Sequence, residues 1–274
     1  MDAPELAGVT RRPDRLGSMF SAISWRYDLL NSLMSLGQDG HWRDLLAASI
    51  PPGARVLDLC CGSARSSAPA FARSGRPVTG LDVSFTMLER GRDYATTRGA
   101  SFAPVHGDGF HLPFRDATFD IVTAAFGLRN LVPLPAAAHE IQRVLAPGGR
   151  FLALDSVAPA GAFAPFHGAY LRHVVPLLGR LSPDPEAYRY LSASIFDFGP
   201  PAIVARRLTD AGFRDVTARP LLLGAVAIFE AHRANSLSPH ERAAEGIVQS
   251  RAEPSEIAQA AMTARAEATV GPTR

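Results

Sequence analysis

The chain has 274 residues, 47% of them hydrophobic and 20% charged, which excludes a wholly disordered protein and suits one large domain with appendages. The formal net charge of +2 is spread along the chain and does not favour nucleic-acid binding. All 28 residues counted as Lys+Arg are arginine, and the lack of lysine excludes Schiff-base chemistry. The two cysteines, Cys60 and Cys61, are adjacent and therefore suit neither a disulfide framework nor a metal site.

The N-terminal region predicts a leader followed by helices. Residues 1–18 mix charged and small residues without an apolar signal core, so we expect a flexible leader on a cytoplasmic protein. From Phe20 to Ile50 apolar residues recur at helical spacing, and Gly37 and Gly40 are expected to break this segment into two helical pieces. No apolar stretch reaches the ~20 residues that a membrane-spanning helix needs.

From Arg55 onward, β-type runs alternate with helical stretches. The predicted strands are Arg55–Leu59, Pro77–Leu81, Ser101–His106, Ile121–Ala125, Gly149–Leu154, Val216–Pro220 and Gly224–Phe229. The predicted helices between them are Ser63–Arg73, Phe85–Thr97, Leu134–Leu145 and Pro201–Ala211. This alternation predicts an α/β fold with a seven-stranded, mostly parallel sheet flanked by helices. The short link before the last strand favours a hairpin, so that strand should run antiparallel at or near the sheet edge.

Two further segments depart from the alternation. Residues 160–195 are rich in aromatic residues and predict an inserted helical cap. Residues 234–274 contain no aromatic residue and predict a mobile tail, which leaves 19–233 as the main domain.

A strand, a turn of small residues and a helix follow one another in Val56-Leu57-Asp58-Leu59-Cys60-Cys61-Gly62-Ser63-Ala64. Such a turn lets backbone N–H groups approach a ligand at the carboxyl end of a strand. Asp82 ends the next predicted strand, where a carboxylate is placed to accept hydrogen bonds from ribose hydroxyls. Asp108 follows the third strand, in position to meet an adenine amino group.

This ordered set, together with Pro147-Gly148-Gly149 before the fifth strand, resembles the class I S-adenosylmethionine-dependent methyltransferases. A nicotinamide-dependent dehydrogenase fits less well because the G-x-G-x-x-G pattern is absent. The resemblance implies S-adenosyl-L-methionine as cofactor. The cofactor contacts that it implies are Asp58, Cys61, Gly62, Asp82, Val83, Asp108 and Gly109.

Segments outside the nucleotide-binding part of the fold narrow the resemblance to one family among these methyltransferases. Met19-Phe20-Ser21, Arg26-Tyr27-Asp28-Leu29-Leu30-Asn31 and Phe126-Gly127-Leu128-Arg129-Asn130 resemble the ubiquinone/menaquinone biosynthesis C-methyltransferases, as does the spacing of Tyr170, His173, Pro176 and Gly179. The resemblance implies methyl transfer to a ring carbon of a prenylated hydroquinone of the demethylmenaquinol type. The lipophilic substrate favours an apolar entrance in the cap and peripheral contact with the inner face of the membrane. Methyl transfer of this kind requires no metal. A homodimer is a candidate assembly.

Methylating an aromatic carbon requires a ring hydroxyl to lose its proton while two reactants are held in line. The catalytic candidates are Arg129, Asn130, Asp155 and Tyr188, and the substrate-binding candidates are Tyr27, Asp28, Asn31, Tyr170 and His173. We expect Arg129 to stabilise the phenolate and either Asp155 or His173 to accept the proton.

The sequence also departs from the family pattern. Arg65 stands where the family usually has an aspartate, and we expect it to face either solvent or the carboxylate of the cofactor. Phe196 stands where the family has an arginine, and Asp155 where it often has a glutamate. A related methyltransferase acting on a phospholipid amine or another aromatic metabolite therefore stays an alternative, as does a non-catalytic scaffold in a quinone-synthesis assembly.

Overall fold

A computed structural model describes residues 17–18, 32, 35, 37–179 and 185–234. The chain divides into two compact units, Met1–Ala234 and Asn235–Arg274, and the description below concerns the first. The leader (1–18) and the tail (234–274), apart from Gly17, Ser18 and Ala234, lie outside the described residues, as do Tyr27, Asp28 and Asn31. The predictions for these segments and residues stay predictions.

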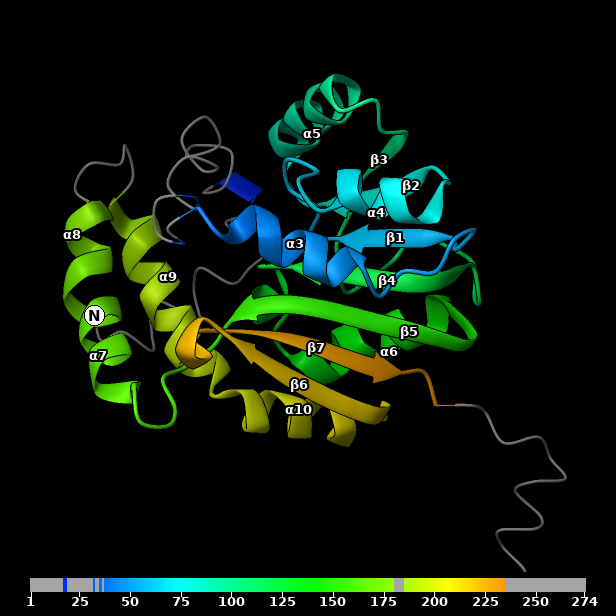
Figure 1. Ribbon diagram of the computed structural model, residues 1–274. Coiled ribbons are helices and arrows are strands. Elements are labelled where there is room, and N and C mark those ends of the chain that lie inside the picture. The colour runs from blue at the N-terminus through cyan, green and yellow to red at the C-terminus, as the bar shows by residue number, and fades with distance from the viewer. Residues whose placement is uncertain (1–16, 19–31, 33–34, 36, 180–184, 235–274) are drawn as a thin grey trace, which may run out of the picture. The chain divides into compact units, whose positions relative to one another are not determined.

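The first unit is built around one seven-stranded sheet with the order β3-β2-β1-β4-β5-β7-β6 (Figure 1). The strands are β1 (Val56–Leu59), β2 (Val78–Asp82), β3 (Phe102–His106), β4 (Phe119–Ala125), β5 (Leu145–Ser156), β6 (Arg214–Leu221) and β7 (Val226–His232). The first five strands pair in parallel, whereas β7 runs antiparallel between β5 and β6. The predicted mostly parallel sheet is thus confirmed. The strand order changes direction between β1 and β4, where such sheets open a crevice for ligands.

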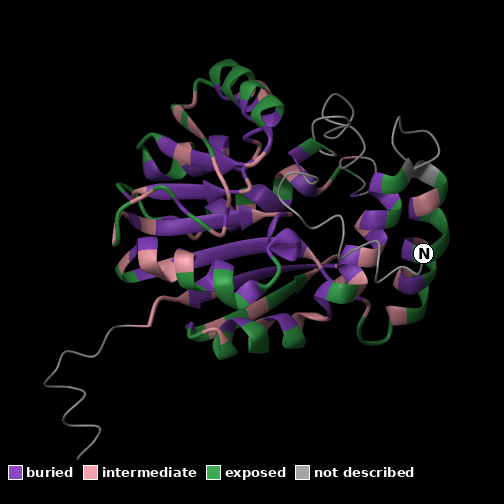
Figure 2. Cartoon of the chain, turned by 180° about the vertical axis from the view of Figure 1, so that it is seen from behind, coloured by how far each residue is buried: buried purple, intermediate pink, exposed green. Residues whose placement is uncertain are grey.

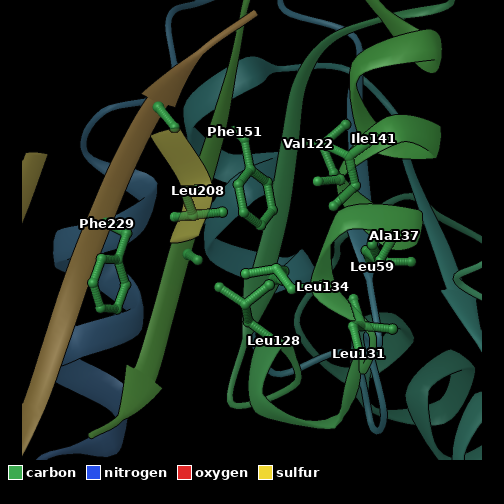
Figure 3. Close-up of a cluster of buried hydrophobic side chains, with 14 of the residues drawn as sticks. Leu59, Val122, Leu128, Leu131, Leu134, Ala137, Ile141, Phe151, Leu208 and Phe229 are labelled. Carbon is green, nitrogen blue, oxygen red and sulfur yellow. The ribbon is translucent and has the colours of Figure 1, made fainter. Parts of the chain in front are cut away.

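Helices cover both faces of the sheet. They are α3 (Asp39–Ala47), α4 (Ser67–Ser74), α5 (Phe85–Thr97), α6 (Leu134–Val144) and α10 (Pro201–Asp210). An apolar cluster joins α3 and α4 to one face, and a larger one joins α6 and α10 to the other (Figure 3). In the larger cluster the Phe151 and Phe213 rings stack with centroids 5.6 Å apart. The central strands of the sheet are largely buried (Figure 2), whereas the edge strands β3 and β6 are more exposed, so the centre of the sheet is a rigid support for the loops at its end.

A second group of helices lies beyond the carboxyl ends of the parallel strands (Figure 1). It contains α7 (Ala164–Ala169), a π-helical turn (Tyr170–Val174), α8 (Val175–Gly179) and α9 (Pro185–Phe198), and we call it the cap. Side chains from several of these helices form an apolar cluster that includes Leu171, Val175 and Ile195. The cap therefore has a small core of its own next to the end of the sheet where ligands are expected.

The expected helix break at Gly40 is wrong, because α3 begins at Asp39 and includes Gly40 in its first turn. The amide N–H of Asp39 donates to Ser35 Oγ at 3.3 Å, and Gly37 takes the left-handed conformation with φ 75°. The turn therefore ends before Gly40. No helix in the described part of the chain is long and apolar enough to cross a membrane.

Candidate active site

The turn after β1 is tied directly to the end of β2. Cys60, Gly62 and Ala64 all have positive φ, between 52° and 58°, so the backbone folds tightly. The Gly62 amide donates to Asp82 Oδ2 at 2.8 Å, and the Ser84 amide donates to Asp82 Oδ1 at 2.8 Å. Burial raises the pKa of the Asp82 carboxyl, while these amide hydrogen bonds favour its charged form. Asp82 thus fixes the turn and keeps oxygen lone pairs available for further donors.

A small cavity of about 50 Å³ opens at this turn, and we call it cavity 1. Its lining residues are Arg43, Cys60, Cys61, Gly62, Ser63, Arg65, Asp82, Met87, Ala125, Phe126, Gly127 and Asn130. They come from α3, the turn after β1, the end of β2, α5 and the loop after β4, all at the expected ligand-binding end of the sheet. Burial raises the pKa of the Cys61 thiol well above its ordinary value, so this side chain is uncharged at neutral pH.

Of the seven predicted cofactor contacts, Cys61, Gly62 and Asp82 line cavity 1. Asp58 does not line it: its carboxylate is fully buried beneath the turn and accepts hydrogen bonds from Ser67 Oγ at 2.5 Å and Thr123 Oγ1 at 2.8 Å. The predicted cofactor contact of Asp58 stays a prediction, and in the structure its carboxylate supports the turn through these hydrogen bonds. All four residues of β1 are buried, so the Asp58 side chain is enclosed together with its neighbours in the strand.

Val83, Asp108 and Gly109 lie at the same end of the sheet but outside the lining of cavity 1. Asp108 is half-buried, and its Oδ1 accepts a hydrogen bond from the Phe110 amide at 3.0 Å. Because Asp82 pairs with His106 across β2 and β3, Asp108 follows only two residues beyond that register. The contact between Asp108 and an adenine amino group therefore stays a prediction, and the position of Asp108 is compatible with it.

The loop after β4 carries the second set of polar groups. Arg129 is 4% exposed, and its Nη1 donates to Asp155 Oδ1 at 2.7 Å and to the Phe126 carbonyl at 2.5 Å. The Arg129 amide also donates to Asp155 Oδ2 at 2.9 Å, and the Ser156 amide to Oδ1 at 2.8 Å. Asp155 is 0% exposed, so this carboxylate fixes both the loop backbone and the guanidinium.

A larger cavity of about 350 Å³ lies between the loop after β4 and the cap, and we call it cavity 2. Its lining residues are Ser35, Asp39, Trp42, Phe126, Arg129, Ser156, Phe163, Phe166, His167, Tyr170, Leu171, Val175, Leu191, Ile195, Leu222, Leu223, Ala225 and Val226. Most of these side chains are aromatic or aliphatic, and a few polar groups converge among them. This composition is typical of a site for a largely apolar small molecule.

The two cavities share one residue, Phe126, which has the left-handed φ of 61°. The neighbouring residues of α3 divide between the cavities, since Trp42 lines cavity 2 and Arg43 lines cavity 1. The Trp42 ring centroid is 6.5 Å from that of Phe126, and Arg43 Cζ is 5.1 Å from the same ring centroid. Cavities 1 and 2 are therefore adjacent, with the Phe126 ring at their common wall.

Tyr170 lines cavity 2 as expected for a substrate residue, but His173 does not line it and is exposed. The π-helical turn over 170–174 widens the helix, so Tyr170 and Val175 face the cavity at a spacing of five residues. His167, one turn earlier, lines the cavity instead. Burial lowers the pKa of the His167 imidazole and raises the pKa of the Tyr170 phenol, so both are neutral near pH 7.

Tyr188 also departs from expectation, because it lies in the apolar cluster of the cap and lines neither cavity. The hydroxyl of Tyr190, two residues further along α9, donates to Asn130 Oδ1 at 2.8 Å. Both tyrosines occur in one helical motif, and the rotation of α9 decides that Tyr190 is the one that reaches Asn130. The predicted catalytic role of Tyr188 stays a prediction. Asn130 lines cavity 1, so this hydrogen bond connects the cap to that cavity.

Several cavity residues were not predicted as site residues, among them Arg43, Trp42 and His167. Trp42 and Arg43 stand side by side in the predicted N-terminal helical segment, and an aromatic next to an arginine was the only local signal. In the part of the chain that the structure describes, no group of three or more His, Cys, Asp or Glu side chains is placed to hold a metal.

Comparison with known proteins places this site in a family. Residues 9–233 match the model of the ubiE/COQ5 methyltransferase family. The demethylmenaquinone methyltransferase of Mycobacterium sp. (strain KMS) is 40% identical over 229 residues, which cover 82% of this chain and 96% of that protein. The demethylmenaquinone methyltransferase of Streptomyces griseus is 38% identical over 234 residues, covering 83% of this chain and 99% of that protein.

Among solved structures, a SAM-dependent methyltransferase from Thermotoga maritima superposes with a TM-score of 0.58 at 15% identity, covering 80% of this chain and 99% of that chain. This likeness supports the class I methyltransferase fold. Because the family model covers most of the sequence and the relatives match over nearly their whole length, the chain belongs to the ubiE/COQ5 methyltransferase family and is an S-adenosylmethionine-dependent methyltransferase.

Proposed function

We propose that this chain transfers a methyl group from S-adenosylmethionine to a ring carbon of a prenylated hydroquinone of the demethylmenaquinol type. The observation that carries the proposal is the adjacency of two cavities of different chemistry at Phe126. One cavity has small residues and a carboxylate at the carboxyl ends of β1 and β2. The other is about 350 Å³ and largely apolar, as a prenylated ring requires.

The residues of cavity 1 fit S-adenosylmethionine. Asp82 offers carboxylate oxygens to hydroxyl donors, and Gly62 leaves room at the turn, where an added Cβ would lie 3.2 Å from Met87 Cε. S-adenosylmethionine supplies, when bound, a methyl group on a positively charged sulfur. Asp82, Gly62 and Cys61 are the residues that we assign to holding it.

On the substrate side, Arg129 is the group that we assign to the ring oxygen. Its ion pair with Asp155 fixes the guanidinium at the wall of cavity 2 before any ligand arrives. A guanidinium held at the wall of a largely apolar cavity favours the ionised form of a neighbouring phenol and stabilises the developing phenolate. Asp155 is then a positioning residue, since its oxygens already accept hydrogen bonds from Arg129 and Ser156.

The proton acceptor that we assign is His167. Because burial lowers the pKa of its imidazole, His167 is neutral near pH 7 and has a lone pair free to take a proton at a ring nitrogen. It replaces the earlier candidates, since Asp155 is enclosed and His173 is exposed outside the cavity.

The cap provides the route for a lipid-soluble substrate. Phe163 and Phe166 line cavity 2 although 46% and 75% of their surfaces are exposed, so the cavity reaches the molecular surface at these rings. Leu223 lines the same cavity and is also largely exposed. We assign this rim to entry of the prenylated substrate from the inner face of a membrane.

The test is a methylation assay on the purified chain. Demethylmenaquinol in detergent micelles, kept reduced, is incubated with S-adenosylmethionine carrying a labelled methyl group, and the quinones are separated by chromatography. The expected result is label on a ring carbon of the quinone. Labelling of a phospholipid amine instead would replace the substrate, and no labelling of any lipid with normal cofactor binding would favour a scaffold role.

A further inference from the structure

Two arginines that line cavity 1, Arg43 and Arg65, lie near the carboxylate of Asp39, which lines cavity 2. Asp39 is buried, and its Oδ1 accepts hydrogen bonds from Ser32 Oγ at 3.0 Å and Ser35 Oγ at 3.3 Å. Its Oδ2 lies 3.8 Å from Arg43 Nε and 3.7 Å from Arg65 Nη2. Both distances are too long for hydrogen bonds, so one carboxylate is shared loosely between two guanidinium groups.

Arg65 is the less satisfied of the two cations. Its side chain is 26% exposed, so most of its surface is turned away from solvent. Its Nε is buried and has no hydrogen-bond partner among the described residues, and its Cζ lies 5.8 Å from the Tyr94 ring centroid. A buried N–H donor without an acceptor destabilises a protein.

The position of Arg65 just before a helix adds to the cost of burying its positive charge. Arg65 lies just before α4, which starts at Ser67, and the N-terminus of a helix carries partial positive charge. A cation at that position is unfavourable unless an anion is bound nearby. Among the described residues the Asp39 carboxylate, 3.7 Å away, is the anion paired with Arg65, whose side chain lines cavity 1 and is placed to receive an anionic group of a ligand.

We propose that Arg65 binds the carboxylate at the amino-acid end of the cofactor and thereby makes cavity 1 selective for adenosine thioethers and sulfonium compounds that carry this carboxylate. This inference rests on the proposed cofactor site. S-adenosylmethionine and its product S-adenosylhomocysteine both have the carboxylate, whereas 5′-methylthioadenosine has the adenosine and sulfur but lacks it. The three compounds therefore separate recognition of the carboxylate from recognition of the nucleoside.

The test is calorimetric titration of the full chain with S-adenosylhomocysteine and with 5′-methylthioadenosine. Arg65→Gln is expected to weaken S-adenosylhomocysteine binding by about tenfold or more, as loss of a charge-assisted hydrogen bond does. Its affinity for 5′-methylthioadenosine should stay within about twofold of the original by the same reasoning. Arg65→Lys should restore part of the loss. Arg92→Gln, an equal charge change at an exposed position of α5, is the matched control and should change neither affinity.

The outcomes separate the two proposals. Equal losses for both ligands, or unchanged S-adenosylhomocysteine affinity, would overturn the role of Arg65 while leaving the cofactor site intact. Failure of the original chain to bind either ligand would overturn the cofactor site itself. Should Arg65→Gln not fold, Asp39→Asn provides the reverse test, because it keeps an oxygen for the serines and removes the competing charge. It should tighten S-adenosylhomocysteine binding, and a weaker affinity would contradict the proposal.

Discussion

Replacing Arg129 with methionine should separate its structural role from its role in the reaction. The change removes the cation that pairs with Asp155 and leaves a fully buried carboxylate with only backbone donors. Breaking a buried ion pair from one side costs about 3–5 kcal/mol. For a domain of this size that corresponds to a fall in Tm of roughly 6–20 °C.

The double variant Arg129→Met/Asp155→Asn removes both charges and keeps one oxygen, which can accept from one of the two backbone amides that donate to separate oxygens of Asp155. It should still regain much of the lost stability, because no uncompensated charge remains in the interior. It should not regain turnover, since the group that stabilises the phenolate is still missing. Loss of such a donor lowers kcat by on the order of 10²–10³.

Three measurements on the single and double variants check this reasoning: Tm, affinity for S-adenosylhomocysteine, and turnover with demethylmenaquinol. The expected pattern is a low Tm in the single variant, a recovered Tm in the double variant, and low turnover in both with nearly unchanged cofactor affinity. Near-normal turnover in the double variant would refute the phenolate role. An equally low Tm in both variants would refute the ion-pair argument.

Further predictions concern the cofactor turn, the base and the packing of the loop after β4. Asp82→Asn should weaken S-adenosylhomocysteine binding about tenfold or more, measured by calorimetry, with Tm recorded because Asp82 also accepts from two backbone amides. If His167 accepts the proton in its neutral form, turnover should be retained below pH 6.5 and then fall as the pH drops through the lowered pKa of its imidazole. His167→Gln should lower kcat by about 10²-fold or more, whereas the exposed control His173→Gln should leave kcat unchanged. Gly127→Ala places a Cβ 2.4 Å from Cys60 Cβ and should destabilise the fold by about 1–3 kcal/mol in chemical denaturation, whereas Gly40→Ala, with nothing within 4 Å, should be neutral or stabilising.

The sequence by itself determined the order and kind of the elements in the α/β domain. Short β-type apolar runs and helical spacing reflect the structure within each segment, so they predicted the strands from Val56 to Phe229, and the short link before the last strand predicted its antiparallel direction. The positions of Gly62 and Asp82 were readable for the same reason, since each follows directly from the end of a strand. The loop containing Arg129 was found through its resemblance to a family.

The tertiary structure decided which side chains meet. Arg129 and Asp155 are 26 residues apart, and Tyr190 and Asn130 are 60 apart, so no local pattern indicates their hydrogen bonds. The choice of His167 over His173 depends on a π-helical turn that changes the helical register. Arg43 and Arg65 share Asp39 only because α3 packs beside the start of α4. Local hydrogen bonding and apolar periodicity are encoded within a segment, whereas the partner of a polar side chain depends on how distant segments pack against each other.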